Sequence, residues 1–189
     1  MSISKASICN MALIDFKANL VTDIDNPTTN EERICNTIFD QAVKETMIEG
    51  SWTSCVRREE LVLTANTPVY GSDYEFQLPT DYPCLKVLDI YCGDRPYSIE
   101  GDKLYSDSNT AKIRYIYYNT NIASWDTLLV RSIVAKLKSL LAGPLTADLS
   151  RMQYADTKFA ALTVEGLAVN SQGSHEMSND GTLIDVRQE

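Results

Sequence analysis

Histidine is nearly absent from this sequence. Its 189 residues include one histidine, His175, in a polar C-terminal stretch. A Ser-His-Asp or Cys-His arrangement needs a histidine beside the nucleophile, and zinc sites draw on clustered histidines and cysteines. The five cysteines are odd in number and include no C-x-x-C pair, which predicts reduced, mostly buried thiols. We therefore expect no histidine-based catalysis, no metal site and no cofactor.

Long apolar runs and an excess of basic residues are lacking as well. No stretch approaches the roughly 20 apolar residues of a membrane-spanning helix. The opening MSISKASICN has no basic segment followed by an apolar one, as a secretory signal would. The formal net charge of −9 disfavours a grip on phosphate backbones. We expect no membrane partner, and DNA that is surrounded without being specifically bound.

The common catalytic and nucleotide-binding motifs are also missing. No P-loop, G-x-G-x-x-G, G-x-S-x-G or H-E-x-x-H occurs. Carboxylates are plentiful, so counting alone does not exclude a pair that cleaves sugars. The visible pairs have simpler explanations, because Glu31 and Glu32 suit the first turn of a helix and Glu59 and Glu60 suit a solvated surface. The chain is therefore predicted not to be an enzyme.

Helical periodicity is present near the N-terminus. A first helix is expected over residues 4–17. Thr28 precedes Glu31, and Thr29 precedes Glu32, by the three positions of a capping box, which predicts the start of a second helix. That helix is expected to end at Gly50.

Helical periodicity returns near the C-terminus. A third helix is expected from about residue 124, and Gly143-Pro144 is expected to end it. A fourth is expected over about residues 147–170. Its apolar positions alternate between spacings of three and four, the narrow seam of a helix in a bundle: Met152, Ala155, Phe159, Leu162, Gly166 and Val169.

Short β-like runs separated by turn residues fill the middle of the chain. In the last of them, Ile113, Tyr115 and Tyr117 alternate with Arg114, Ile116 and Tyr118, so the two sets are expected on opposite faces of one strand. The expected strands cover residues 55–64, 74–78, 84–91, 96–99, 103–105 and 111–119.

Two prolines interrupt the segment YEFQLPTDYPCLKVLDIY, residues 74–91. Pro79 is expected to end one strand, Asp81 to bond the turn backbone and Pro83 to fix the entry to the next strand. This turn is interpreted as a corner between strands, since no catalytic partners accompany it. Trp52, between the second helix and the first strand, is interpreted as a core plug because an aromatic buries so much area.

These elements predict an α+β fold. We expect a four-helix bundle made of two N-terminal and two C-terminal helices, with an inserted antiparallel β region and an extended C-terminal tail. The corresponding division is 1–52 and 122–171 for the discontinuous helical bundle, 53–121 for the β insertion and 172–189 for a flexible tail.

Four stretches together resemble one protein family. They are ICNMALIDF near the N-terminus, NEERICNTIFDQAVKETMIEGSW, the Leu-Pro-x-Asp segment with Leu78, Pro79 and Asp81, and KIRYIYYNT with the helix after it. In this order they are similar to the tail tubular protein A family, the head-to-tail adaptors of short-tailed bacteriophages. Lys17 departs from the family, which often has a glycine there, and Pro83 lies in an apparent insertion.

The resemblance implies a virion structural protein rather than an enzyme. Members form a ring, expected to be a dodecamer, between the portal protein and the tail nozzle (a tail tubular protein B-like protein), and they extend the channel for genome ejection. The expected location is the tail or neck of the virion, after assembly in the host cytoplasm. An acidic channel would let DNA slide.

The tail has an expected role in that assembly. Its few apolar residues suit folding onto a partner. The predicted contacts to the portal or a neighbouring subunit are Leu183, Ile184, Val186 and Arg187. The alternatives are a nucleic-acid-binding module, a carboxylate-based cell-wall hydrolase and another phage assembly factor.

Overall fold

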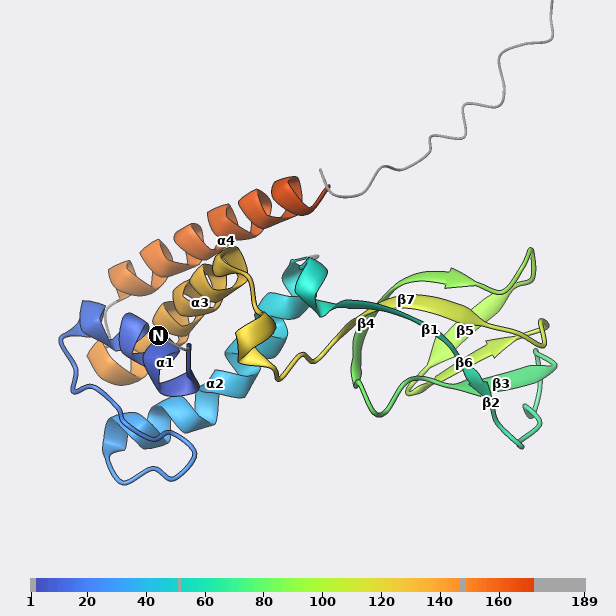
Figure 1. Ribbon diagram of the computed structural model, residues 1–189, viewed down its shortest axis with the longest axis horizontal. Coiled ribbons are helices and arrows are strands. Elements are labelled where there is room, and N and C mark those ends of the chain that lie inside the picture. The colour runs from blue at the N-terminus through green and yellow to red at the C-terminus, as the bar shows by residue number, and fades with distance from the viewer. Residues whose placement is uncertain (1–2, 51, 147–148, 172–189) are drawn as a thin grey trace, which may run out of the picture.

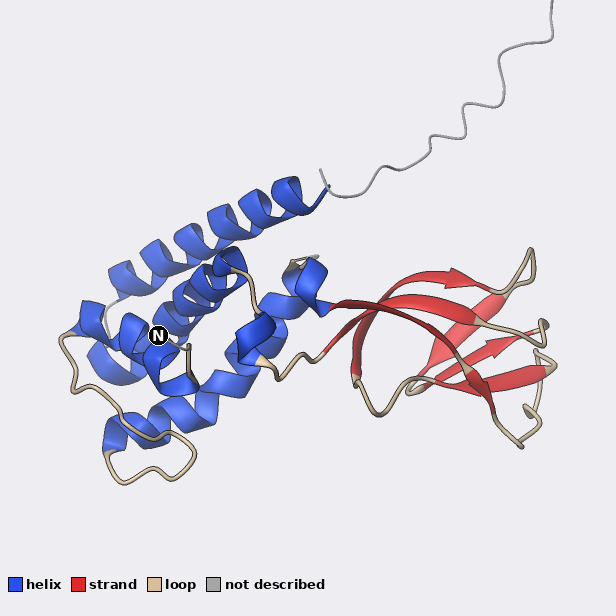
Figure 2. Cartoon of the chain, in the orientation of Figure 1, coloured by secondary structure: helices blue, strands red, loops and turns tan. Residues whose placement is uncertain are grey.

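The computed structural model describes residues 3–50, 52–146 and 149–171. Helices gather at one end of the long axis and strands at the other (Figures 1 and 2). The helices are α1 (Lys5–Leu13), α2 (Asn30–Glu49), α3 (Thr127–Thr146) and α4 (Leu149–Ser171), with 3-10 turns η1 (Ile14–Phe16), η2 (Thr53–Cys55) and η3 (Ile122–Ser124). The strands are β1 (Val56–Glu60), β2 (Val62–Leu63), β3 (Tyr74–Gln77), β4 (Cys84–Tyr91), β5 (Tyr97–Glu100), β6 (Lys103–Ser106) and β7 (Lys112–Tyr117).

The start of α2 follows from the sequence with one correction. Thr29 is the N-cap, its hydroxyl accepts from the Glu32 N–H, and Glu32 accepts from the Thr29 N–H, which is a capping box. The second expected box, Thr28 with Glu31, does not form. Thr28 instead donates its N–H and hydroxyl to Glu32, at 2.8 and 2.9 Å. One carboxylate therefore serves both threonines, and Gly50 caps the far end of α2.

The expected end of the third helix was wrong. Gly143 and Pro144 lie inside α3, which continues to Thr146. Proline removes one helical N–H, but it does not force the chain out of helical geometry when the remaining bonds and packing hold the turn. Leu140 and Leu145, on either side of the pair, both pack against the core.

The four-helix bundle was also wrong. Helix α3 contacts each of the other three helices. Helices α1 and α2 pack on it, and α4 packs along it, whereas α1 and α2 make few contacts with each other. The contacts of α4 are chiefly with α3, through a separate small cluster of Ala135, Phe159 and Leu162. The buried face of α4 contains few large side chains, because Ala155 and Gly166 are among its buried positions. This face therefore packs against one helix and does not contribute to a core shared by four.

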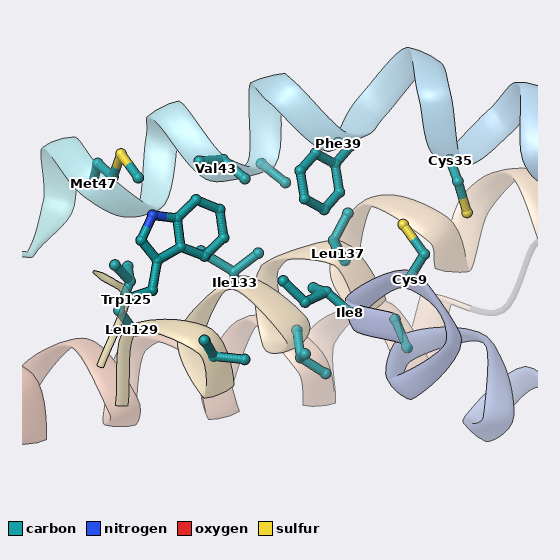
Figure 3. Packing of buried hydrophobic residues seen from close by; sticks show 14 of the residues in the cluster. Ile8, Cys9, Cys35, Phe39, Val43, Met47, Trp125, Leu129, Ile133 and Leu137 are labelled. Atoms are coloured by element: carbon teal, nitrogen blue, oxygen red, sulfur yellow. The ribbon is translucent and has the colours of Figure 1, made fainter. Parts of the chain in front are cut away.

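The main core lies where α1, α2 and α3 meet. Phe39, Val43 and Met47 of α2 approach Ile133 and Leu137 of α3 (Figure 3). All five are almost fully buried, which is the largest source of stability in this part of the chain.

The strands form two antiparallel sheets. Their orders are β1-β7-β4 and β2-β3-β6-β5. The expected strand 55–64 is divided at buried Leu61, so β1 joins the first sheet and β2 the second. Strand β7 shows the predicted alternation in its packing, because Ile113 and Tyr115 belong to the β core while Ile116 belongs to the helical core.

The Leu-Pro-x-Asp turn connects the two sheets, from β3 to β4. Tyr82 holds it in place: the Arg57 guanidinium lies 3.6 Å from the centre of its ring, and the Tyr117 ring meets it edge-on at 5.6 Å. The Pro83 carbonyl accepts from the Tyr118 N–H at 3.0 Å. Among the described residues, Asp81 has no hydrogen-bond partner, so the turn depends on Tyr82 rather than on the expected carboxylate.

Candidate interaction surfaces

Two short chain segments join the helical end to the β end. We call them the waist, residues 52–55 and 118–126. The Ser54 carbonyl accepts from the Asn119 side-chain amide at 2.9 Å and from the Tyr117 hydroxyl at 3.3 Å. The Trp125 indole donates to the Asn119 carbonyl at 3.1 Å. The bond from Asn119 to Ser54 ties the returning segment to the outgoing one, so the waist is a crosslinked joint rather than two independent linkers.

Trp52 fills the helical side of the waist. It is fully buried, and its indole N–H donates to the Thr46 carbonyl at 2.8 Å. A Cβ placed on Gly50 would lie 2.3 Å from the indole, and one on Gly166 would lie 2.5 Å from it. No side chain fits at either position, because the Trp52 ring lies so close to both backbones. The absence of a side chain at Gly166 allows α4 to approach Trp52 at the end of α2.

An open groove lies at the helical end, between α1–η1 on one side and the first half of α4 on the other. Its volume is about 580 Å³. Val130 and Val134 of α3 form the floor. Met11, Phe16, Tyr154 and Leu162 are among the residues of its walls. Met11 is 45% exposed and Tyr154 is 74% exposed, so apolar surface is open to solvent here.

The charged residues around this groove are mostly basic. Lys138 pairs with Asp15 at 2.5 Å. Arg131 and Lys158 also line the groove, and neither forms an ion pair with another described residue. A cationic rim of this kind on a chain of net charge −9 favours an acidic, partly apolar occupant.

Apolar side chains are also exposed at the two ends of the molecule. At the helical end they include Ile14 and Leu20, 61% and 60% exposed. At the β end they include Val69 and Tyr70, 97% and 86% exposed, in the loop between β2 and β3. Figure 1 places η1 and this loop at opposite ends. These residues are candidate contact points at the two ends.

The first sheet carries several carboxylates, which bears on the hydrolase alternative. Each of them has a partner. Glu60 pairs with Lys112 at 3.7 Å and Asp89 with Arg114 at 2.5 Å. Glu59 accepts from the Tyr115 hydroxyl at 2.8 Å. This arrangement is that of a charged sheet surface, which discourages stray strand pairing.

Two carboxylates whose pKa is lowered, Glu32 and Glu75, have structural roles. Glu32 is nearly buried. The N–H groups of Thr28, Thr29 and Thr22 hold its pKa well below the ordinary value. Lys103 lowers the pKa of Glu75 in the β end. A general acid of a glycosidase needs the opposite shift, upward in an apolar pocket.

Metal sites and membrane-spanning helices can both be judged within the described ranges. Residues 3–50, 52–146 and 149–171 contain no group of three or more His, Cys, Asp or Glu side chains that could hold a metal ion. None of the helices in these ranges is long and apolar enough to cross a membrane.

Several residues named from the sequence lie in the framework of the fold. Pro79, Asp81 and Pro83 form the connection between the sheets, and Trp52 lies at the waist. The predicted contacts of the tail, Leu183, Ile184, Val186 and Arg187, lie outside the described residues. Of the four that the structure describes, Trp52, Pro79, Asp81 and Pro83, none lines the groove.

Sequence reasoning missed the groove. The sequence contained one signal for it: two basic residues, Arg131 and Lys138, lie seven positions apart beside the apolar Val130 and Val134. That spacing puts both cations along one helix face. Which other elements line the groove depends on where α4 packs, and periodicity does not reveal that.

No protein-family model matches the chain, and no curated protein sequence matches it.

Proposed function

We propose that this chain is a structural connector, a head-to-tail adaptor that forms a ring between the portal and the tail nozzle of a short-tailed phage. The observation that carries the proposal is the presence of exposed apolar side chains at opposite ends of an elongated chain, Ile14 and Leu20 at one end and Val69 and Tyr70 at the other. A connector needs two separate contact surfaces of this kind, whereas an enzyme needs one convergent site.

The resemblance to the tail tubular protein A family supports the same proposal through residues with structural roles. Asn10 holds the loop after η1, since its amide group bonds the N–H and carbonyl of Val21 at 2.8 and 2.9 Å. Asp40 accepts from the Tyr118 hydroxyl at 2.9 Å and so links α2 to the strand region. These matched positions support the fold on which an adaptor would be built.

The acidic balance also suits a channel protein. A net charge of −9 repels DNA rather than holding it, so a genome would slide past such a ring. In the assembled state we place the contacts of Leu183, Ile184, Val186 and Arg187 against the portal or a neighbouring subunit. Substituting the three apolar residues by aspartate in the full chain should then weaken portal binding, with the circular dichroism spectrum unchanged.

The test is assembly with the portal protein of the same phage, followed by electron microscopy of the product. A ring of twelve copies beneath the portal is the expected result. A chain that stays monomeric beside a saturating amount of portal would overturn the proposal. Because the ring is expected to form on the portal, a monomer in isolation is the appropriate control.

A further inference from the structure

The groove at the helical end is a built apolar surface with no occupant among the described residues. Its floor residues Val130 and Val134 are 5% and 9% exposed, while the wall residues Met11 and Tyr154 remain open. About 580 Å³ is enough space for a few aliphatic side chains. Leaving such a surface uncovered is unfavourable, because apolar burial stabilises by about 25 cal/mol per Å².

The charges select the kind of occupant. Arg131 and Lys158 form no ion pair with other described residues, and Lys138 is already paired with Asp15. The best occupant is therefore a short segment that combines aliphatic residues with acidic ones.

The chain itself contains a segment of this composition. Residues 172–189 carry four acidic residues and one basic residue, a net charge of −3. Within them, Leu183, Ile184 and Val186 surround Asp185, and Asp180 precedes the cluster. We infer that the C-terminal segment of the same chain binds this groove, with Leu183, Ile184 and Val186 on the apolar floor and the aspartates near Arg131 and Lys158.

The length of the chain permits this. Lys158 lies thirteen positions before Ser171, where α4 ends, a distance of about 20 Å along a helix. Twelve steps separate Ser171 from Leu183, and an extended chain spans roughly 40 Å over them. The aliphatic cluster can therefore turn back and reach the groove. Tethering also gives a segment on the same chain an effective concentration of about a millimolar, which a free partner rarely matches.

This inference concerns the free chain and does not depend on the connector proposal. In an assembled ring, the same segment would leave the groove for the contacts proposed above. A second copy that inserts its own segment is the competing occupant, and the test separates the two.

Disulfide trapping in the full-length chain tests the inference. The reporter carries Met11→Cys and Leu183→Cys, and the control carries Val164→Cys and Leu183→Cys, both with Cys84→Ser. Val164 is 67% exposed and lies on α4 only seven positions before Ser171. A segment that samples space freely therefore reaches Val164 more readily than Met11.

The expected result is closure of the Met11 pair within one chain, about tenfold faster than the Val164 pair, as local concentration dictates. Adding Lys158→Glu should slow the Met11 pair. Lys86→Glu, at an exposed position of strand β4, should not slow it. Faster closure at Val164, a disulfide-linked dimer as the main product, or no effect of Lys158→Glu would each overturn the inference.

Discussion

The helical end and the β end of this chain are stabilised in different ways. Among the described residues, the helical end has one large core of 21 buried residues, supplied by α1, α2, α3, the loop before α2, strand β7 and the waist, whereas the β core has eight. The β end compensates with polar contacts: buried Glu75 accepts from Lys103 and from the Thr64 hydroxyl, and Ser106 donates to the Pro96 carbonyl at 2.9 Å. The β end thus combines a smaller apolar core with buried polar contacts.

The two ends are nevertheless not independent. Strand β7 sends Tyr115 into the β core and Ile116 into the helical core. The waist adds hydrogen bonds between its two segments at Ser54 and Asn119. The comparison teaches that a small sheet region can be held by a neighbouring helical core through two strands, β4 and β7, that pack in both cores.

Replacing Trp52 by alanine is the change with the largest expected effect. The ring is fully buried and contacts both α2 and α4, so the free energy of unfolding should fall by about 3–5 kcal/mol. Urea unfolding followed by circular dichroism measures it. Tyr70→Ala, at an exposed position of the β end, is the matched control and should change stability by at most about 0.5 kcal/mol. Equal effects of the two substitutions would contradict the role of the waist.

A pair of leucine truncations tests whether the two ends unfold together. Leu137 in the helical core and Leu104 in the β core are both fully buried, and replacement of either by alanine should lower the free energy of unfolding by about 2–5 kcal/mol. Because β7 packs in both cores, we expect one shared transition for helices and strands in each variant. Tryptophan fluorescence and hydrogen exchange of the β strands provide the two readouts. Two separate transitions in Leu104→Ala would show that the ends are uncoupled.

Gly166, which packs against Trp52, gives a smaller effect. In Gly166→Ala the new methyl group would meet the Trp52 ring, and overpacking of this kind lowers stability by about 1–3 kcal/mol. In Gly143→Ala it would meet no atom within 4 Å, so the change should stay below about 1 kcal/mol. Thermal unfolding of both variants decides the point, and a larger loss at Gly143 would refute the packing account.

The smallest expected effect is the pH dependence contributed by Glu32. Its pKa is lowered in the folded chain by the N–H groups of Thr28, Thr29 and Thr22. Such a carboxylate stabilises the fold above its unfolded pKa, near 4.5, and this contribution is lost as the pH falls toward the lower folded pKa. Glu32→Gln should therefore be less stable than the wild type at neutral pH, with the gap narrowing below about pH 4.5. Urea midpoints measured from pH 7 to pH 3 test this.

Glu165→Gln, exposed on α4, is the control for the pH series. It should leave the midpoint nearly unchanged throughout. A gap between wild type and Glu32→Gln that stays constant across the series would refute the assigned cause.

Local features of the fold were predictable because they depend on neighbouring residues. The capping box at Thr29 and the alternation along β7 both follow from short-range chemistry. The division of one β run at Leu61 was not predictable, since it depends on which sheet each half joins. The continuation of α3 past Pro144 was not predictable either. Proline normally disfavours the interior of a helix, and here packing against the core outweighs that local preference.

The packing of α4 explains the main error and the missed groove together. An alternation of threes and fours predicts a helix with a narrow seam, but it does not say how many partners that seam has. Here the described contacts of α4 are chiefly with α3, so Met11 and Tyr154 are left facing an open space. The exposed pairs at the two ends carry no sequence signal either, because a single apolar residue in a loop is ordinary.

The central claim is that the two ends of the chain bind different partners. Two variants test it most directly: Ile14→Asp with Leu20→Asp at the helical end, and Val69→Asp with Tyr70→Asp at the β end. All four positions are exposed, so folding should be preserved. Cosedimentation with the portal and, separately, with the nozzle should show each variant losing one partner and keeping the other. If both variants keep both partners, or both lose the same one, the two-ended connector is contradicted.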